Sequence, residues 1–399
     1  MSNTFRPGAA RALFLATTAF TVSLAVWGLI SALAPTFTQL YGLSAKSKSL
    51  MIAIPVLLGA IGRLPAGMLT DRFGGRKVFS GLLALSALPA IGIASSTSYT
   101  QLLLLGLFLG MAGTTFAVGV SFVSKWFAAD KQGFALGVYG AGNIGQSVAV
   151  FGAPALAGAL GSWRPIFYIF AALALVWGLV FYSFARDAAL TAQPKTLSEN
   201  LSVLRRSPMA WVLSLFYFVT FGGFVAFSIY LPTFLKDIFK LTATDAGART
   251  AGFVLLATLM RPIGGILADK VGGAKILLVV FAAVAGFGLL MGAAWMPTFT
   301  VGALGAAAAL GLGNGAVFKL VPEYFPKETG TVTGLVGAFG GLGGFFPPLT
   351  LGIVRDATGS YTLGFVFLSL FALFCLAVNY FVFLKKRQHA GISAAMAAN

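Results

Sequence analysis

Long apolar stretches follow one another along nearly the whole chain, separated by short polar, glycine-containing or proline-containing joints. Most reach the ~20 residues that an α-helix needs to cross the ~30 Å hydrocarbon core of a bilayer. We expect twelve spans, at 12–40, 47–70, 78–97, 100–126, 132–159, 165–186, 209–238, 246–268, 275–296, 299–322, 329–354 and 361–384. A membrane β-barrel would show short alternating segments instead. The sequence therefore predicts an all-α polytopic membrane protein with twelve transmembrane helices.

The composition excludes a soluble enzyme. Of the 399 residues, 58% are hydrophobic and only 9% are charged, whereas an average soluble domain is about 25% charged. Cys375 and His389 are the single cysteine and the single histidine, so the sequence offers no cysteine or histidine metal site. A buried acid pair or a serine–histidine arrangement for intramembrane catalysis is also missing. We expect no enzymatic activity, no metal and no cofactor.

The basic charge is best explained by membrane topology. The net charge is +17, yet the basic residues form no single patch of the kind that binds nucleic acid. With the N-terminus placed in the cytoplasm, eighteen of the 27 basic residues fall in cytoplasmic joints and tails, and seven fall outside. This asymmetry obeys the positive-inside rule. We therefore expect a multi-pass protein of a prokaryotic cytoplasmic membrane, with both termini cytoplasmic.

The two halves of the sequence repeat each other. A shift of 198 positions lays Gly67–Lys77 over Gly265–Lys275 and Gly142–Gly145 over Gly340–Gly343. Each repeat holds six spans, an even number, so both copies share one orientation, as in the major facilitator arrangement. The domains that we expect are a six-helix bundle at 1–186, a cytoplasmic linker at 187–207, a second six-helix bundle at 208–387 and a tail at 388–399.

Two arginines lie deep in the predicted spans. Arg63 and Arg261 each stand eight residues before an aspartate, Asp71 and Asp269, which places them ~12 Å inside the cytoplasmic end. Burial there costs about 2.5–3.5 kcal/mol even on a lenient scale. All ten acids fall at span ends or in joints, so we expect an anionic substrate to supply the missing partner. In the alternative, the arginines snorkel or donate to backbone carbonyls.

The guanidinium group narrows the class of anion. It is a planar fork, which suits flat delocalised oxyanions better than spherical ions. Two forks from opposite halves can hold a small trigonal anion such as nitrate or nitrite. Formate and oxalate would satisfy the same chemistry, so a small-carboxylate exchanger remains an alternative.

Several motifs resemble those of known transporters. Gly67–Lys77 is similar to the signature loop between helices 2 and 3 of the major facilitator superfamily. The glycine-rich segments Gly140–Gly145 and Gly337–Pro347, together with the paired arginines, resemble the nitrate/nitrite porter family, and the resemblance covers essentially the whole chain. It implies a substrate held between arginines and flanked by aromatic rings. The positions that match this family's site are Arg63, Arg261, Phe116, Asn143, Tyr217 and Phe221.

Charged and small residues near the span ends suggest conformational roles. We expect the charged clusters to latch helix ends on the cytoplasmic side in one state, unless they are solvated loops; their members are Asp71, Arg72, Arg76 and Asp269. Glycines in the two signatures let helices approach closely, for sliding or for static packing. These glycines are Gly142, Gly145, Gly340 and Gly343.

The function expected from these features is secondary active transport of nitrate, with nitrite as a second substrate, by alternating access. The resemblance of a compact chain slightly favours proton-coupled import. Because the interiors of the predicted spans contain no carboxylate or histidine to carry a proton, nitrate/nitrite exchange remains an alternative. The partners are then a small inorganic anion, the proton and membrane lipid. We expect a monomer that binds no nucleic acid.

Overall fold

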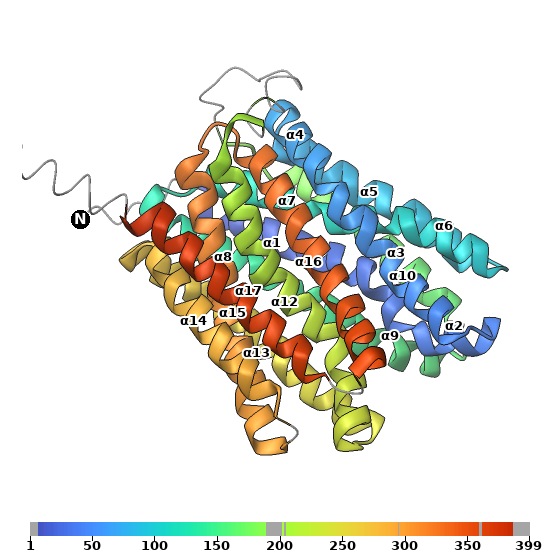
Figure 1. The fold of residues 1–399 in the computed structure, drawn as a ribbon. Coiled ribbons are helices and arrows are strands. Elements are labelled where there is room, and N and C mark those ends of the chain that lie inside the picture. Colours follow the sequence, from blue (N-terminus) through green and yellow to red (C-terminus); the bar gives the residue numbers. More distant parts are fainter. Residues whose placement is uncertain (1–6, 189–201, 203–204, 294, 359–360, 386–399) are drawn as a thin grey trace, which may run out of the picture.

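The computed structural model describes residues 7–188, 202, 205–293, 295–358 and 361–385, and all secondary structure among them is helical (Figure 1). The first half of the chain forms α1 (Ala9–Ala32), α2 (Ala34–Tyr41), α3 (Ala45–Ile61), α4 (Arg63–Phe73), α5 (Gly75–Ala94), α6 (Tyr99–Leu109), η1 (Gly110–Thr114), α7 (Thr115–Ser124), η2 (Ala129–Lys131), α8 (Gln132–Gly140), η3 (Ala141–Asn143), α9 (Ile144–Leu160) and α10 (Arg164–Phe184). The second half forms α12 (Pro208–Phe239), α13 (Ala243–Val271), α14 (Gly273–Met291), α15 (Met296–Tyr324), α16 (Thr329–Thr358), α17 (Thr362–Asn379) and η4 (Tyr380–Lys385).

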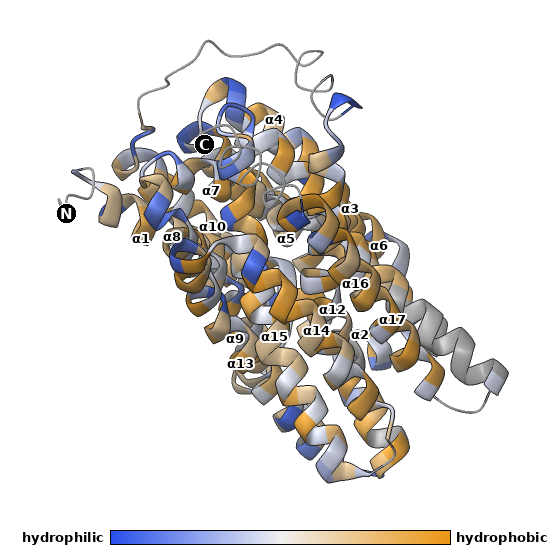
Figure 2. Cartoon of the chain, turned by 60° about the vertical axis from the view of Figure 1, so that its left-hand side comes forward, coloured by the Kyte–Doolittle hydropathy of each residue, from blue (hydrophilic) through white to orange (hydrophobic). Residues whose placement is uncertain are grey.

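The predicted all-α membrane architecture is confirmed. Within the described ranges, eleven helical stretches are long and apolar enough to cross a bilayer. The 30-residue helix α16 stands where the remaining span, 329–354, was predicted. Figure 2 shows apolar residues along most of the helix lengths, and large side chains such as Leu179 and Val279 are each 67% exposed on the outside. Such surfaces fit a lipid environment.

Three spans of the first half are interrupted near mid-depth. The second predicted span divides into α3 and α4 at Gly62, the fourth contains the 3₁₀ segment η1, and the fifth contains η3. Pro65 follows the first break and cannot donate a backbone hydrogen bond to Ile61, which explains why the helix is interrupted there. Helix α13, by contrast, runs unbroken through Pro262. These interruptions position Arg63 as the first residue of α4.

The helices of the two halves meet along α4 and α16, along α7 and α16, and along α8 with α13 and α15. Within each half, α1 packs against α9 and α12 packs against α16. Paired helices of the two halves thus enclose the centre of the molecule. The interior of the site is formed where α4, α7, α12, α13, α15 and α16 come together.

The described chain begins and ends on one side of the helix bundle. Gly8, before α1, lies against Trp126. Trp126 follows Lys125, which forms an ion pair with Asp71. At the other terminus, the Phe383 ring lies 5.6 Å from the Tyr324 ring at the end of α15. We call this side, which carries Asp71 and Asp269, the aspartate end. It corresponds to the side predicted to face the cytoplasm.

Candidate functional site

The structure brings the two predicted arginines together in the centre. Arg63 is 6% exposed and Arg261 is 2% exposed. Their Cζ atoms lie 5.2 and 5.3 Å from the centre of the Phe221 ring, so they are at most about 10.5 Å apart, the sum of these distances. Two cations thus share one aromatic ring from α12. Residues 198 positions apart in the sequence face the same central site.

Backbone carbonyl groups accept hydrogen bonds from both arginines, as the alternative interpretation anticipated. Arg63 donates from Nε to the Gly113 oxygen at 3.3 Å and from Nη1 to the Gly337 oxygen at 2.7 Å. Arg261 donates from Nη1 to the Gly140 oxygen at 3.3 Å. Each guanidinium therefore reaches a glycine carbonyl of the opposite half. The central arginines themselves bridge the two halves.

Arg261 keeps one edge of its guanidinium without a partner. Its Nε and Nη2 atoms are buried and form no hydrogen bond. These two atoms share one side of the planar group, so they can donate in parallel to two oxygen atoms of one anion. Buried unpaired donors are costly, the more so on a charged group. The edge therefore has the chemistry of an anion-binding site.

The aromatic residues predicted for the site form nearly parallel walls. The Phe116 and Phe221 rings are inclined by 10° with centres 6.3 Å apart. The Tyr217 ring is inclined by 7° to Phe116 and by 4° to Phe221. A flat molecule between two rings needs roughly 7 Å, twice an optimal carbon contact. The perpendicular gap between Phe116 and Phe221 is at most the 6.3 Å between their centres, so this aromatic slot is narrower than a planar occupant requires.

The Tyr217 hydroxyl also lacks a partner. Tyr217 is fully buried, and its hydroxyl lies beside the Arg261 guanidinium. No hydrogen bond of normal geometry joins the two groups. Phe318 of α15 borders the same ring edge-on, at 4.5 Å between centres, and borders Phe116 at 4.8 Å. Sequence reasoning missed Phe318. The sequence feature that could have identified Phe318 is its position one helical turn after Asn314, a polar residue inside the predicted span 299–322.

Asn143 lies near the site but is already engaged. Its side chain is 5% exposed, and Nδ2 donates to the Gly140 oxygen at 2.6 Å. That oxygen is the one that also accepts from Arg261. Asn143 and Arg261 therefore share an acceptor on α8. In this arrangement Asn143 can position the arginine.

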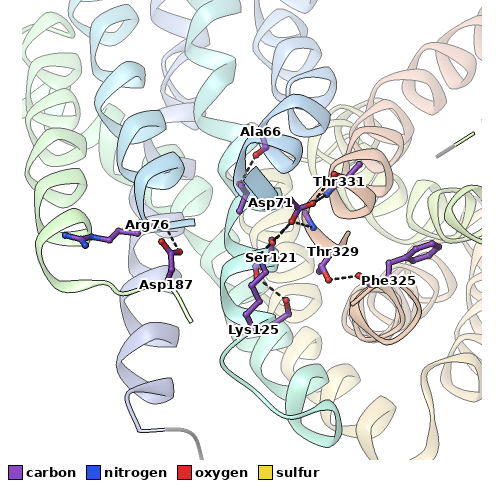
Figure 3. A network of polar contacts seen from close by, with 12 residues as sticks. Ala66, Asp71, Arg76, Ser121, Lys125, Asp187, Phe325, Thr329 and Thr331 are labelled. Carbon is purple, nitrogen blue, oxygen red and sulfur yellow. Dashed lines mark hydrogen bonds and ion pairs between the residues drawn. The ribbon is translucent and has the colours of Figure 1, made fainter. Parts of the chain in front are cut away.

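Asp71 joins the two halves at the aspartate end (Figure 3). Its carboxylate accepts hydrogen bonds from the backbone N–H groups of Gly330 at 3.1 Å and Thr331 at 2.8 Å, in the first turn of α16. The Thr331 hydroxyl donates at 2.9 Å and the Ser121 hydroxyl at 3.2 Å. A carboxylate at a helix N-terminus is favoured by the unpaired N–H groups and the helix dipole.

Asp269 makes the corresponding contact from the second half of the chain to the first. It accepts from the backbone N–H groups of Gly133 at 2.9 Å and Phe134 at 2.8 Å, in the first turn of α8. Lys319 of α15 forms an ion pair with it at 3.2 Å and also donates to the Ala129 carbonyl. The two aspartates therefore place carboxylates on helix N-termini across the interface.

Arg72 and Arg76, which were grouped with these aspartates, contact residues of their own half. Arg76 donates from Nε to the Tyr182 oxygen at 2.6 Å and lies 4.5 Å over the Tyr182 ring. Its backbone N–H donates to Asp187 at 3.0 Å (Figure 3). Arg72 is exposed and lies over the ring of Phe73. The Arg76 side chain therefore joins α5 to α10, whereas Arg72 contacts its neighbour in α4.

The signature glycines pack helices within each half. A Cβ atom on Gly142 or Gly145 would meet α1, and one on Gly340 or Gly343 would meet α12. The closest approach between the halves involves other glycines. Gly67 of α4 meets the backbone of Gly330, and Gly265 of α13 meets that of Gly133. The latter pairs lie at the aspartate end.

A cavity of about 210 Å³ lies on the other side of the site, between helices of both halves. Its lining residues are Trp27, Ser31, Ile52, Pro55, Val56, Gln146, Val150 and Ser228. Ser228 stands two turns beyond Phe221 on α12, about 10 Å further from the aspartate end. The molecule is thus closed at the aspartate end and hollowed on the opposite side.

Two helical halves around a buried site, closed at the aspartate end and with a cavity on the other side, are the arrangement of a membrane transporter. The sequence matches the model of the Major Facilitator Superfamily over residues 15–348 and 216–398. It is 43% identical over 366 residues to "Nitrite extrusion protein" of Bacillus subtilis (strain 168), covering 91% of this chain and 92% of that protein.

A second relative is "Probable nitrate transporter NarT" of Staphylococcus epidermidis, 39% identical over 384 residues, covering 95% of this chain and 97% of that protein. Among solved structures, the human organic anion transporter MFSD10 superposes with a TM-score of 0.80 at 17% identity, covering 94% of this chain and all of that one. The chain belongs to the major facilitator superfamily and, within it, to the nitrate/nitrite porter family.

Proposed function

We propose that this chain is a secondary transporter that binds nitrate, and nitrite, between its halves and carries the anion across a prokaryotic cytoplasmic membrane. The observation that carries this proposal is the unpartnered Nε–Nη2 edge of Arg261, buried beside the Tyr217 hydroxyl. A planar oxyanion can accept from both arginine atoms and from the hydroxyl while its faces lie against parallel rings. The names of the two bacterial relatives support this substrate class.

The site distinguishes the proposed substrates from other anions by shape. A spherical halide can use only part of a parallel donor edge, whereas two oxygen atoms of nitrate or nitrite match both donors. Formate and oxalate also present two oxygen atoms, so small carboxylates are the nearest competitors. Formate carries a hydrogen and oxalate a second carboxylate where nitrate carries its third oxygen. Competition against nitrate therefore separates these substrate classes.

Transport is proposed to proceed by rocking of two six-helix bundles, 1–186 and 208–387, joined by the linker 187–207. Closure at the aspartate end would be held by Asp71, Asp269 and the close glycine pairs between halves. The cavity near Ser228 would be the entry from the other side. With the aspartate end in the cytoplasm, this arrangement is an outward-facing state. Opening at that end must break both aspartate contacts.

Proton-coupled nitrate import remains the favoured coupling. Moving an anion inward against the membrane potential costs about 2.3 kcal/mol per 100 mV, so import needs a driving ion or an exchanged anion. The Asp71 and Asp269 side chains, 9% and 8% exposed, lie in the last turns of α4 and α13, at the span ends as predicted. They stand at the contacts that must break during transport.

Nitrate/nitrite exchange is the second candidate. It is favoured by the hydrogen-bond partners of Arg63 and Arg261, which in the described chain are backbone oxygens. Within the described chain, neither arginine is hydrogen-bonded to a carboxylate or histidine that would release a proton when the anion binds. In an exchanger, the returning nitrite would satisfy the same donor edge.

Reconstitution into proteoliposomes tests both levels of the proposal. We expect the purified protein to take up labelled nitrate, with uptake rising under an inward proton gradient and requiring no internal nitrite. Uptake that ignores the pH gradient and requires internal nitrite would assign the chain to exchange. Displacement of labelled nitrate by formate or oxalate at concentrations similar to unlabelled nitrate would overturn the nitrate assignment. Liposomes without protein provide the background.

A further inference from the structure

Asn314 of α15 is a buried amide without a hydrogen-bond partner. Its side chain is 3% exposed, and neither Nδ2 nor Oδ1 forms a hydrogen bond. Buried amides normally find partners, as Asn379 does when its Nδ2 donates to the Ala274 oxygen at 2.8 Å. Asn314 therefore keeps a donor and an acceptor available in the interior of the second half.

Its neighbours place Asn314 level with the central arginine. Gly315, the next residue, packs directly on the backbone carbonyl of Arg261. Phe318 lies one helical turn further along the same face of α15, and its ring borders Phe116 and Tyr217. The face of α15 that carries Asn314 and Phe318 therefore looks onto the aromatic slot. Asn314 lies on this face near Arg261.

The internal repeat gives the same placement independently. The shift of 198 positions that relates Arg63 to Arg261 also relates Phe116 to Asn314. Phe116 lies over the Arg63 guanidinium, with Cζ 5.4 Å from its ring centre. By pseudo-symmetry Asn314 stands beside Arg261 as Phe116 stands beside Arg63. The first half presents an aromatic wall where the second presents an amide.

We propose that Asn314 orients the substrate by donating from Nδ2 to the oxygen of nitrate that Arg261 does not hold. This inference rests on the proposed function. The Nε–Nη2 edge accommodates two oxygen atoms. Nitrate has a third oxygen atom, whereas nitrite has only two. Asn314 is therefore a determinant of nitrate over nitrite preference.

The test compares both anions in purified full-length protein. Asn314→Leu keeps the approximate size of the side chain but removes the amide. We expect nitrate binding to weaken about 10- to 100-fold, the range for a hydrogen bond to a charged group, and nitrite binding to change less than about threefold. The melting temperature should stay equal or rise, because an unpaired buried polar group is lost. Asn314→Ala should have the same effect as Asn314→Leu: nitrate binding weakens and nitrite binding changes little.

Asn379→Leu is the matched control, a buried asparagine at the end of α17 whose Nδ2 bonds Ala274. It should leave the ratio of nitrate to nitrite affinity unchanged. If both Asn314 variants bind nitrate normally, or lose nitrate and nitrite equally, the inference is wrong while the proposed function stands. Failure of the wild-type protein to bind either anion would overturn the proposed function and the inference with it.

Discussion

At the scale of single residues, the central question is how two arginines are accommodated without carboxylates. Glycine carbonyls do this, because glycine has no side chain to shield its oxygen from a bulky guanidinium. Arg63 donates to two of them, at Gly113 and Gly337, whereas Arg261 donates to one at Gly140. Arg261 therefore keeps a whole Nε–Nη2 edge for a ligand, whereas Nε and Nη1 of Arg63 are already bonded. Arg63 supplies charge and bridges the halves.

The first prediction concerns variants that keep the positive charge of each arginine but lose its planar guanidinium group. Arg261→Lys keeps the positive charge but loses the planar Nε–Nη2 edge, and Arg63→Lys loses the bridge between Gly113 and Gly337. Either change should lower nitrate uptake at least 100-fold in proteoliposomes, with a normal elution profile in gel filtration. Near-normal uptake by either variant would contradict the role of that guanidinium.

The second prediction isolates one hydroxyl group. Tyr217→Phe keeps the ring that stacks on Phe221 and removes the unpartnered hydroxyl beside Arg261. Nitrate binding measured by calorimetry should weaken about tenfold, as for loss of one hydrogen bond to a charged group. Tyr139→Phe is the control, because its hydroxyl is already bonded to the Thr115 oxygen at 2.9 Å. Equal losses in both variants would refute a direct role for Tyr217.

At the scale of elements, helix pairs set how closely the halves can approach. Helix α4 meets α16, and α13 meets α8, where glycines let one backbone touch the other. At the same places Asp71 and Asp269 face the N-termini of α16 and α8. Close approach is what brings each carboxylate within reach of the opposite N–H groups. Packing and polar contact therefore depend on the same small residues.

The third prediction follows from this packing. A methyl group at Gly265 would meet the Gly133 backbone, whereas one at Gly252, also on α13, would meet nothing within 4 Å. Gly265→Ala should lower the transport rate at least tenfold and lengthen the distance between spin labels on α8 and α13 at the aspartate end. Gly252→Ala should transport normally. Equal transport by both variants would show that the glycine contact is dispensable.

At the scale of the whole molecule, the two ends differ. The aspartate end is closed by two symmetry-related carboxylate contacts, although only Asp269 is matched with a buried lysine, Lys319. The other side holds the cavity that Ser228 lines. A substrate can therefore approach the slot from the cavity side. The slot itself must widen to admit a flat anion between Phe116 and Phe221, whose ring centres are 6.3 Å apart.

The fourth prediction tests this asymmetry with thiol labelling. Ser228→Cys should react with a membrane-impermeant maleimide applied from the side opposite the aspartate end, and saturating nitrate should slow the reaction. Ser214→Cys on the same helix should stay unreactive, because Ser214 is fully buried. The native Cys375 is buried and gives little background. Reaction of both engineered cysteines at similar rates would contradict the one-sided opening.

Much of the fold could be predicted from the sequence, because a bilayer leaves few choices. Apolar runs of sufficient length must be helical there, since every backbone polar group needs an internal partner. The repeat then predicted two copies with one orientation, and the depth of Arg63 and Arg261 predicted a central site. These inferences depend on local pattern and on helix rise alone.

The tertiary structure decided what depends on side-chain partners. It showed that carbonyls from Gly113, Gly140 and Gly337 bond the arginines, and that the two arginines differ in the donors left over. It also placed the closest contacts between halves at Gly67 and Gly265 rather than at the signature glycines. Periodicity along a chain gives the depth and face of a residue, but hydrogen-bond partners come from helices distant in sequence, so only their packing identifies them.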